Sequence, residues 1–382
     1  MQNDVYQRSL EMHKRQHGKI EIVSKVKLSS GEVLAMAYTP GVAEVSRQIA
    51  ANPELAREYT LKRNTIAIVS DGSAILGLGN LGPLAAIPVM EGKAAIFKEF
   101  AGVDAFPICL DTQDVEEIIK AVKQIAPVFG GINLEDICAP RCFEIEERLR
   151  AELSIPVMHD DQWGTATVNL AGIINALKLT GLNKETAKVV INGVGAAGVA
   201  TARLLIHYGI KNIVFCDSHG IIHRGRAELT KEKQEQLDGS IAVASEGSLA
   251  DAVKGADIFI GLSKPGLLSG EMVKTMASKP IIFALSNPVP EIMPDEALAA
   301  GAFIVATGRS DFPNQLNNSL AFPGIFKGML AANIHQFRIE MFANVAEALA
   351  GSVVDLTPRK ILPTMFEPGV VRTVSGAIQK EV

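Results

Sequence analysis

The second half of the chain repeats one pattern of apolar and polar positions. In each repeat a short, continuously apolar run ends at a small or polar residue, and a segment of helical periodicity follows it. These runs occupy 188–192, 212–217, 257–263, 280–287 and 302–307. Because unbroken apolar runs are typical of strands that helices cover on both faces, the pattern predicts a Rossmann-like, doubly wound parallel sheet.

The first half is less regular and mixes the two periodicities. Helical patterns at 114–126 and 141–153 are interspersed with strand-like runs at 65–70 and 105–110. They predict an N-terminal α/β domain, but the pattern does not order its strands.

The predicted domain boundary lies near residue 160. A helix is expected over 165–180, with Gly181 as its stop signal, directly before the Rossmann-like half. We therefore expect an N-terminal domain over 1–160 and a second domain, built on the doubly wound sheet, over 161–382. The tail of the second domain is helical in pattern, and its segment 340–350 could pack back on the first domain.

Length, charge and cysteine content exclude several classes of protein. The chain has 382 residues, which suits two domains, and its net charge of −5 offers no basic surface for nucleic acid or anionic membranes. The start of the chain has no apolar signal-peptide core, and prolines interrupt the most apolar stretch, 74–90. Four cysteines without CxxC spacing indicate reduced thiols rather than zinc ribbons or disulfides. We expect a cytoplasmic protein with a small-molecule partner.

A glycine-rich loop after the first apolar run predicts a dinucleotide site. Gly193, Gly195 and Gly198 form GxGxxG directly before a helical segment, and Ala196 and Ala197 lie inside the motif. The first glycine permits a tight turn, the second lets the backbone approach a pyrophosphate, and the third allows close helix packing. This strand–loop–helix context makes the prediction specific.

Asp217 ends the next predicted strand, where a carboxylate can bind the ribose hydroxyls of the cofactor. Alone it favours NAD, because it repels the additional phosphate of NADP. His219, Arg224 and Arg226 follow closely and could instead receive that phosphate, although solvated surface charge is the simpler interpretation. The sequence is therefore compatible with either NAD or NADP, and it favours NAD.

A second GxGxxG, formed by Gly77, Gly79 and Gly82, lacks the same context. Pro88 is expected to interrupt the segment behind it, and no strand ending in an acid comes next. We interpret it as a loop that packs tightly against a neighbouring helix.

Two acidic pairs suggest a divalent metal site. Glu135 and Asp136 form one, and Asp160 and Asp161 form the other at the expected domain boundary. Converging carboxylate oxygens, completed by water and substrate, would suit Mg²⁺ or Mn²⁺. A single pair would be a solvated helix start, but two pairs beside apolar segments favour a bound cation. His159 is interpreted as a structural residue rather than a ligand.

The sequence resembles the malic enzymes over nearly its whole length. The resemblance is carried, in order, by AYTPGVA (37–43), DGSAILGLGNLG (71–82), EGKAA (91–95), NLEDI (133–137), HDDQWGT (159–165), NGVGAAG (192–198), SNP (286–288) and NNS (317–319). The resemblance implies Tyr38 as general acid and Lys93 as general base. It also implies Glu135, Asp136 and Asp161 as metal ligands, and Asn287 and Asn318 as residues that contact malate or the nicotinamide. Without it, Tyr38 and Lys93 would be interpreted as a turn aromatic and a solvated helix lysine.

One departure concerns the substrate. Larger members of the family have an arginine that binds a substrate carboxylate where this chain has Ala74, and an aspartate where it has Asn80. Another donor must therefore bind that carboxylate, and Asn287 and Asn318 are the first candidates.

The resemblance implies oxidative decarboxylation of L-malate to pyruvate and CO₂ with NAD or NADP and a divalent metal. It also implies a homodimer or larger homo-oligomer. Two alternatives remain: a metal-dependent oxaloacetate decarboxylase without significant redox activity, and a nucleotide-binding regulatory protein without turnover. The intact glycine loop and Asp217 favour the dehydrogenase.

Overall fold

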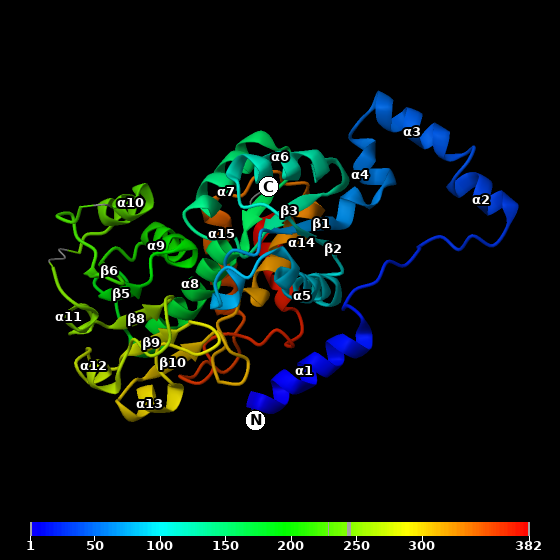
Figure 1. The fold of residues 1–382 in the computed structure, drawn as a ribbon. Coiled ribbons are helices and arrows are strands. Elements are labelled where there is room, and N and C mark those ends of the chain that lie inside the picture. The colour runs from blue at the N-terminus through cyan, green and yellow to red at the C-terminus, as the bar shows by residue number, and fades with distance from the viewer. Residues whose placement is uncertain (1, 228, 243–245, 381–382) are drawn as a thin grey trace.

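The computed structural model describes residues 2–227, 229–242 and 246–380, and contains two parallel sheets with helices around them (Figure 1). The strands are β1 (Thr65–Ser70), β2 (Asp104–Cys109), β3 (Gly131–Leu134), β4 (Val157–His159), β5 (Val189–Asn192), β6 (Ile213–Asp217), β7 (Gly220–Ile221), β8 (Ile258–Gly261), β9 (Ile281–Ala284) and β10 (Ile304–Thr307).

The α-helices are α1 (Gln2–Gln16), α2 (Gly31–Ala37), α3 (Val42–Ala51), α4 (Leu55–Tyr59), α5 (Pro83–Ile96), α6 (Val115–Ile125), α7 (Arg141–Glu152), α8 (Asp160–Thr180), α9 (Ala196–Tyr208), α10 (Lys231–Gly239), α11 (Leu249–Val253), α12 (Gly270–Lys274), α13 (Pro294–Ala299), α14 (Phe322–Ala332), α15 (Ile339–Gly351) and α16 (Val370–Gln379). Shorter helical turns are η1 (Leu61–Asn64), η2 (Ile75–Gly77), η3 (Phe97–Ala101), η4 (Ala126–Val128) and η5 (Asn318–Leu320).

The first sheet has the strand order β2-β1-β3-β4 and is entirely parallel. The second has the order β10-β9-β8-β5-β6-β7, with all pairs parallel except β6 with β7. Four neighbouring strands of the second sheet, β5, β8, β9 and β10, are buried along their length, as expected for unbroken apolar runs. The predicted fold class, a Rossmann-like parallel sheet beside an N-terminal α/β domain, is confirmed.

Two local expectations differ from the structure. Helix α8 begins at Asp160 rather than at 165, because the acidic pair itself forms its first turn, where negative charge favours a helix. Helix α5 continues through Pro88, which was expected to interrupt it. Proline removes only one backbone hydrogen bond, and the buried residues Ala86, Met90 and Ala94 keep α5 packed on the sheet.

The largest core cluster is continuous between the two halves of the molecule. It joins β1 and α5 to α8 and to the C-terminal helices. The ring of Phe97 in η3 lies 4.8 Å from that of Phe322 in α14, so the tail does pack on the first domain. The expected segment, 340–350, lies instead mainly against α8 and α16. The boundary expected near residue 160 falls where β4 passes into α8.

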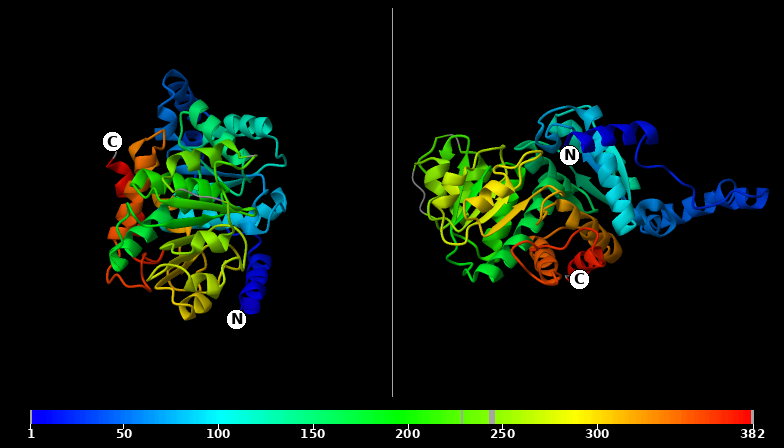
Figure 2. Two further views of the ribbon diagram at one scale, coloured as in Figure 1. Left: turned by 90° about the vertical axis from the view of Figure 1, so that its left-hand side faces the viewer. Right: turned by 90° about the horizontal axis from the view of Figure 1, so that it is seen from below.

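The segment 21–64 differs from this body. Helices α2 and α3 project away from both sheets, as the views of Figures 1 and 2 agree, and no residue of the segment is buried. We call residues 21–64 the arm. None of the helices in the described ranges combines the length and apolarity needed to cross a bilayer.

Candidate active site

A cavity of about 750 Å³ lies between the two sheets. Its lining comes from α5, from the segment after β3, from the start of α8, and from the loops that follow β5, β8, β9 and β10. Parallel strands all end at the same edge of their sheet, and open α/β sheets bind ligands there. The two sheets therefore direct their ligand-binding edges into one space.

Lys93 lies at the centre of a buried charged cluster. Its side chain is 7% exposed, and its Nζ lies 2.6 Å from Oε2 of Glu135 and also donates to Asp160. Asn133 donates to the same Glu135 oxygen at 2.9 Å. Helix α5 brings Lys93 to the carboxylates that follow β3 and begin α8, so three distant segments build the cluster.

Electrostatics in this cluster favour a bound cation. Burial raises the pKa of Glu135 well above its ordinary value, against the opposing charge of Lys93. Burial and the charge of Asp161 raise the pKa of Asp136 to about 7. Burial lowers the pKa of Lys93, but the charges of Asp160 and Glu135 outweigh it and the net shift is upward. The neighbouring acids therefore favour the protonated form of Lys93, while burial and mutual repulsion oppose the ionisation of Glu135 and Asp136, which a bound cation would favour.

The residues fit a divalent ion in their chemistry. Glu135, Asp136 and Asp161 all line the cavity, as hard oxygen ligands for Mg²⁺ or Mn²⁺ would. Oδ2 of Asp136 is buried without a hydrogen-bond partner, which is costly unless a ligand satisfies it. Within the described chain, no three acidic, histidine or cysteine side chains already surround a common point as a metal site. The carboxylates would have to converge, and Glu135 now faces Lys93.

Asp161 is positioned by a chain of buried polar contacts. Its Oδ2 accepts the backbone N–H of Asp136 at 2.8 Å and lies 3.0 Å from Nε2 of the buried His159. Burial opposes the ionisation of Asp161, but His159, the charge of Lys93 and the backbone hydrogen bond together lower its pKa, whereas the pKa of His159 is raised despite burial. His159 thus acts as a structural partner of an acid, in agreement with its interpretation from sequence.

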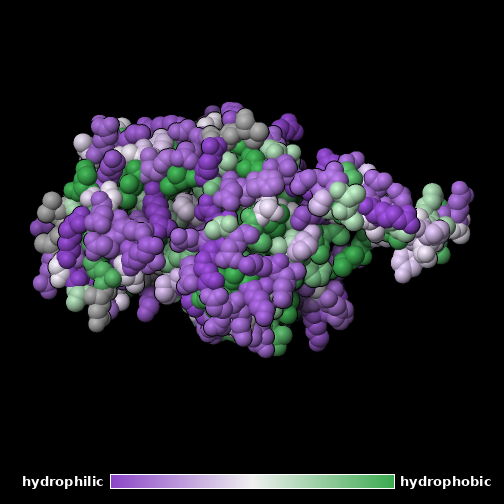
Figure 3. Space-filling model, turned by 90° about the horizontal axis from the view of Figure 1, so that it is seen from above, coloured by the Kyte–Doolittle hydropathy of each residue, from purple (hydrophilic) through white to green (hydrophobic). Residues whose placement is uncertain are grey.

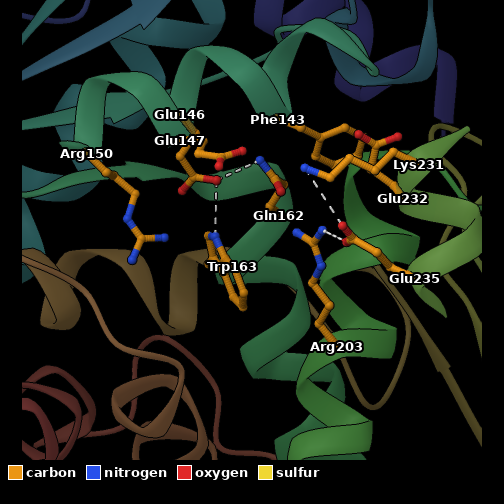
Figure 4. A pocket seen from close by; sticks show the side chains of 10 residues that line it. All are labelled: Phe143, Glu146, Glu147, Arg150, Gln162, Trp163, Arg203, Lys231, Glu232 and Glu235. Atoms are coloured by element: carbon orange, nitrogen blue, oxygen red, sulfur yellow. Dashed lines mark hydrogen bonds and ion pairs between the residues drawn. The ribbon is translucent and has the colours of Figure 1, made fainter. Parts of the chain in front are cut away.

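Glu146 supports the same segment from a second cavity of about 310 Å³ (Figure 4). Its carboxylate accepts the backbone N–H of His159 at 3.0 Å and the side chains of Gln162 and Trp163 at 2.8 and 3.2 Å. Glu146 is 5% exposed, so it ties α7 to the start of α8 from inside the protein. Glu146 is not predictable from the sequence, because an acid within a charged helix has no local signal of burial.

The predicted dinucleotide loop has the expected geometry. Gly193 has φ of 105°, and a side chain there would meet the carbonyl oxygen of Leu262 at 2.5 Å. A side chain at Gly198 would lie 2.0 Å from the carbonyl of Gly193. Gly195 has open space around it and, with Ala196 and Ala197, lines the cavity at the start of α9. A pyrophosphate can therefore approach the N-terminus of this helix.

Asp217 ends β6 as predicted, but both of its oxygens are bound. Arg226 donates to Oδ1 and Oδ2 at 3.0 Å each, and Lys233 donates to Oδ2 at 2.7 Å. These hydrogen bonds outweigh burial and lower the pKa of Asp217. Arg226 is therefore an ion-pair partner rather than a solvated charge, whereas Arg224 bonds to Asp238 at 2.6 Å. Lys233 is not among the residues predicted from sequence, because only the fold of helix α10 brings it back to the strand end.

Asn287 and Asn318 also line the cavity, from the loop after β9 and from η5. The second glycine motif lies beside Asn287. A side chain at Gly77 would meet the carbonyl oxygen of Asn287 at 2.5 Å, so this loop packs across the seam between the domains. The prediction of a tightly packed loop holds, with a loop rather than a helix as its neighbour.

Tyr38 is not brought to this cavity within one chain. It caps the C-terminus of α2 on the arm, is 66% exposed, and does not line the cavity that contains Lys93. The expected acid is thus spatially separated from the expected base within the described chain, a second difference from the predicted site beside the carboxylates that do not yet converge.

Residues 17–150 match the family of malic enzyme N-terminal domains, and residues 163–382 match the family of malic enzyme NAD-binding domains. The chain belongs to the malic enzyme family. The two matched domains meet at the cavity. The N-terminal domain contributes Lys93 and Glu135, and the NAD-binding domain contributes the glycine loop.

Known malic enzymes resemble the chain over most of its length. A bifunctional malic/malolactic enzyme of Bacillus subtilis is 51% identical over 375 residues, which cover 97% of this chain and 92% of the relative. An NAD-dependent malic enzyme of Geobacillus stearothermophilus is 53% identical, covering 94% of this chain and 76% of the relative. The crystal structure of the NAD-dependent malic enzyme of Thermotoga maritima matches with a TM-score of 0.94 at 49% identity, over 97% of this chain and 98% of that one.

Proposed function

We propose that the protein converts L-malate to pyruvate and CO₂ with reduction of NAD or NADP, assisted by Mg²⁺ or Mn²⁺. The observation that carries this proposal is the buried Lys93–Glu135–Asp160 cluster on the wall of the cavity that the dinucleotide loop also lines. Proton acceptor, metal-type ligands and cofactor loop thus share one space large enough for a small acid and a nicotinamide ring. We further propose that residues 1–160 and 161–382 form the two functional domains of a cytoplasmic enzyme.

The chain's own residues supply binding and proton transfer. The glycine loop would hold the dinucleotide, whose chemistry would be hydride acceptance, and Glu135, Asp136 and Asp161 would hold a divalent ion, whose chemistry would be that of a Lewis acid. Lys93 takes the proton of the C2 hydroxyl. Neutralising Glu135 removes one of the two charges that keep Lys93 protonated, so Lys93 becomes a usable base only once the acidic cluster is neutralised. The C3–C4 bond then breaks, CO₂ leaves, and C3 of enolpyruvate needs one proton.

We infer that Tyr38 donates this proton to the site of a second copy of the chain. The arm that holds Tyr38 exposes apolar side chains, among them Ile22, Val23, Leu28 and Met36, all at least 60% exposed. Apolar and polar residues are interspersed along it (Figure 3). An extended apolar segment without buried residues favours contact with another protein surface. A symmetric homodimer would exchange two arms and complete two sites.

NAD is the preferred cofactor in this proposal, because Asp217 can meet the ribose hydroxyls and repels a phosphate. Arg226 and Lys233 already neutralise that carboxylate, so the preference should be modest. Asp217→Ser would release both cations toward a 2′-phosphate and should shift the ratio of NAD to NADP affinity by about tenfold toward NADP. Fluorescence titration with both reduced cofactors measures this, and an unchanged ratio would contradict it.

The proposed reaction is tested by incubating the protein with L-malate, NAD or NADP, and Mn²⁺. Absorbance at ~340 nm should rise with equimolar pyruvate, EDTA should stop the reaction, and Mn²⁺ should restore it. Pyruvate formation from oxaloacetate without cofactor reduction on malate would instead identify the redox-inactive decarboxylase. Malate turnover that is indifferent to EDTA would reject the metal assignment.

A further inference from the structure

The cavity contains a basic group that the proposed reaction has not yet used. Its basic lining residues, within the described ranges, are Lys93, Lys19 and His13. Lys93 is committed to Glu135 and Asp160. The amine of Lys19 instead donates to the carbonyl oxygen of Pro88 and, at 2.7 Å, to Nε2 of His13. These hydrogen bonds go to an imidazole nitrogen and a carbonyl oxygen rather than to a carboxylate, and Glu91 is the acid whose charge acts on this ammonium. The ammonium can therefore still donate to an anion in the cavity.

Lys19 lies beside Pro88 and Gly92 of α5, the helix that also carries Lys93. Its backbone N–H donates to Oε2 of Glu91 at 3.1 Å, which fixes the segment after α1 against α5. A side chain at Gly92 would come within 3.6 Å of the Lys19 Nζ, so the ammonium lies directly beside the residue that precedes Lys93. Pro88, Gly92 and Lys93 all line the cavity.

His13 orients this ammonium through a specific tautomer. Its Nδ1 lies 2.8 Å from the carbonyl oxygen of Ser9, which can only accept, so Nδ1 carries the hydrogen. Nε2 then has a free lone pair and accepts a hydrogen bond from Lys19. Burial lowers the pKa of Lys19 while the charge of Glu91 opposes the shift. A partly desolvated ammonium binds a carboxylate more strongly than a fully hydrated one.

The substrate supplies the matching anion. Malate carries two carboxylates, and Ala74 leaves no cation at the position where larger relatives have an arginine. The C4 carboxylate loses its charge when CO₂ departs, so a cation bound to it would stabilise the substrate more than the transition state. The C1 carboxylate keeps its charge throughout and is attached to C2, whose hydroxyl must reach Lys93.

We propose that Lys19, positioned by His13, binds the C1 carboxylate of malate and takes the place of the missing arginine. This proposal rests on the proposed function and extends it to a substrate-binding residue outside every motif that carries the family resemblance. It also replaces Asn287 and Asn318 as the first candidates for this carboxylate, since an amide provides no charge.

Three ligands distinguish the contributions of the C1 and C4 carboxylates to binding. L-Malate has both, 2-hydroxybutyrate retains C1 and the hydroxyl but has a methyl at C4, and 3-hydroxybutyrate retains C4 and the hydroxyl but has a methyl at C1. Binding of each to the Mn²⁺-loaded protein is measured by isothermal titration for the parent, Lys19→Met and Lys19→Gln. Lys14→Met, an exposed lysine on α1, is the matched control. Equal binding of Mn²⁺ and NADH by all variants verifies folding.

Both Lys19 variants should lose malate and 2-hydroxybutyrate affinity by about 10- to 100-fold and keep 3-hydroxybutyrate affinity within about twofold. Lys14→Met should match the parent. Unchanged malate affinity, equal loss for all three ligands, or loss confined to malate and 3-hydroxybutyrate would each overturn the assignment of Lys19 to C1. Failure of the parent protein itself to bind malate would overturn the proposed function as well.

Discussion

The proposed base and the proposed acid of this enzyme lie in opposite surroundings. Lys93 is 7% exposed and contacts two carboxylates that the chain's own packing holds in place. Tyr38 is 66% exposed on an arm without a buried residue. Both regions are incomplete, but in different ways: the Lys93 cluster contains buried carboxylates whose ionisation burial opposes, and the arm has uncovered apolar surface. A cation would complete the first, and a second protein surface would complete the second.

The largest expected effect tests the buried side of this comparison. Lys93→Ala should lower malate turnover by on the order of 10³-fold, because it removes the group placed to accept the C2 hydroxyl proton. Lys98→Ala, at a lysine on the same helical segment whose side chain is 57% exposed, should leave the rate within about twofold. Initial rates of cofactor reduction measure both. Parental turnover in Lys93→Ala would show that the base is another residue.

A smaller effect is expected on the exposed side. Met36→Asp places a charge in the apolar surface of the arm and should weaken the proposed dimer, lowering turnover by about 10- to 100-fold in dilute protein. NADH binding should not change, because the dinucleotide loop lies elsewhere. Sedimentation velocity and rates over a range of protein concentrations measure this. Glu32→Gln, an exposed polar position on the same helix, is the control. A monomeric but fully active Met36→Asp would refute the role of the arm.

The smallest effect concerns the free energy of unfolding. Its pH dependence should come from the buried acidic cluster and not from the exposed arm. The folded-state pKa of Asp136 is raised to about 7 from an ordinary value of 3.8. Between these values the folded protein holds a proton that the unfolded chain has lost, so its contribution to stability is present below the lower pKa and is lost as pH rises. The metal-free protein should lose up to about 1.4 kcal/mol per pH unit in this window.

Asp136→Asn should reduce this slope, and Glu58→Gln on the exposed arm should not. Urea unfolding at several pH values between about pH 4 and pH 7 gives the slopes. Equal slopes for the parent and Asp136→Asn would mean that Asp136 ionises normally in the folded protein, and that the acidic cluster does not need a cation.

Sequence alone predicted what depends on local pattern. The unbroken apolar runs gave the strands β1, β5, β6 and β8 to within two residues at their ends, because a strand buried on both faces has a distinctive composition. The glycine loop was equally local, since Gly193 and Gly198 are required by contacts within one turn of chain and its neighbouring strand.

The features that sequence missed depend on contacts between distant segments. Lys233 reaches Asp217 only because α10 folds back over β6. Glu146 is buried only because α8 begins against α7. Lys19 follows a polar helix and becomes part of the cavity only through Glu91 and Pro88 on α5. The position of Tyr38 is the extreme case, because its proposed partners belong to another molecule.

The most direct test of the account is subunit complementation between Lys93→Ala and Tyr38→Phe. The two variants are co-expressed with different affinity tags, and dimers carrying both tags are purified. If acid and base of one site come from different chains, each mixed dimer contains one intact and one doubly defective site, and should recover about half of the parental malate turnover. Activity no greater than that of either variant alone would show that each chain completes its own site, or that Tyr38 is not the acid.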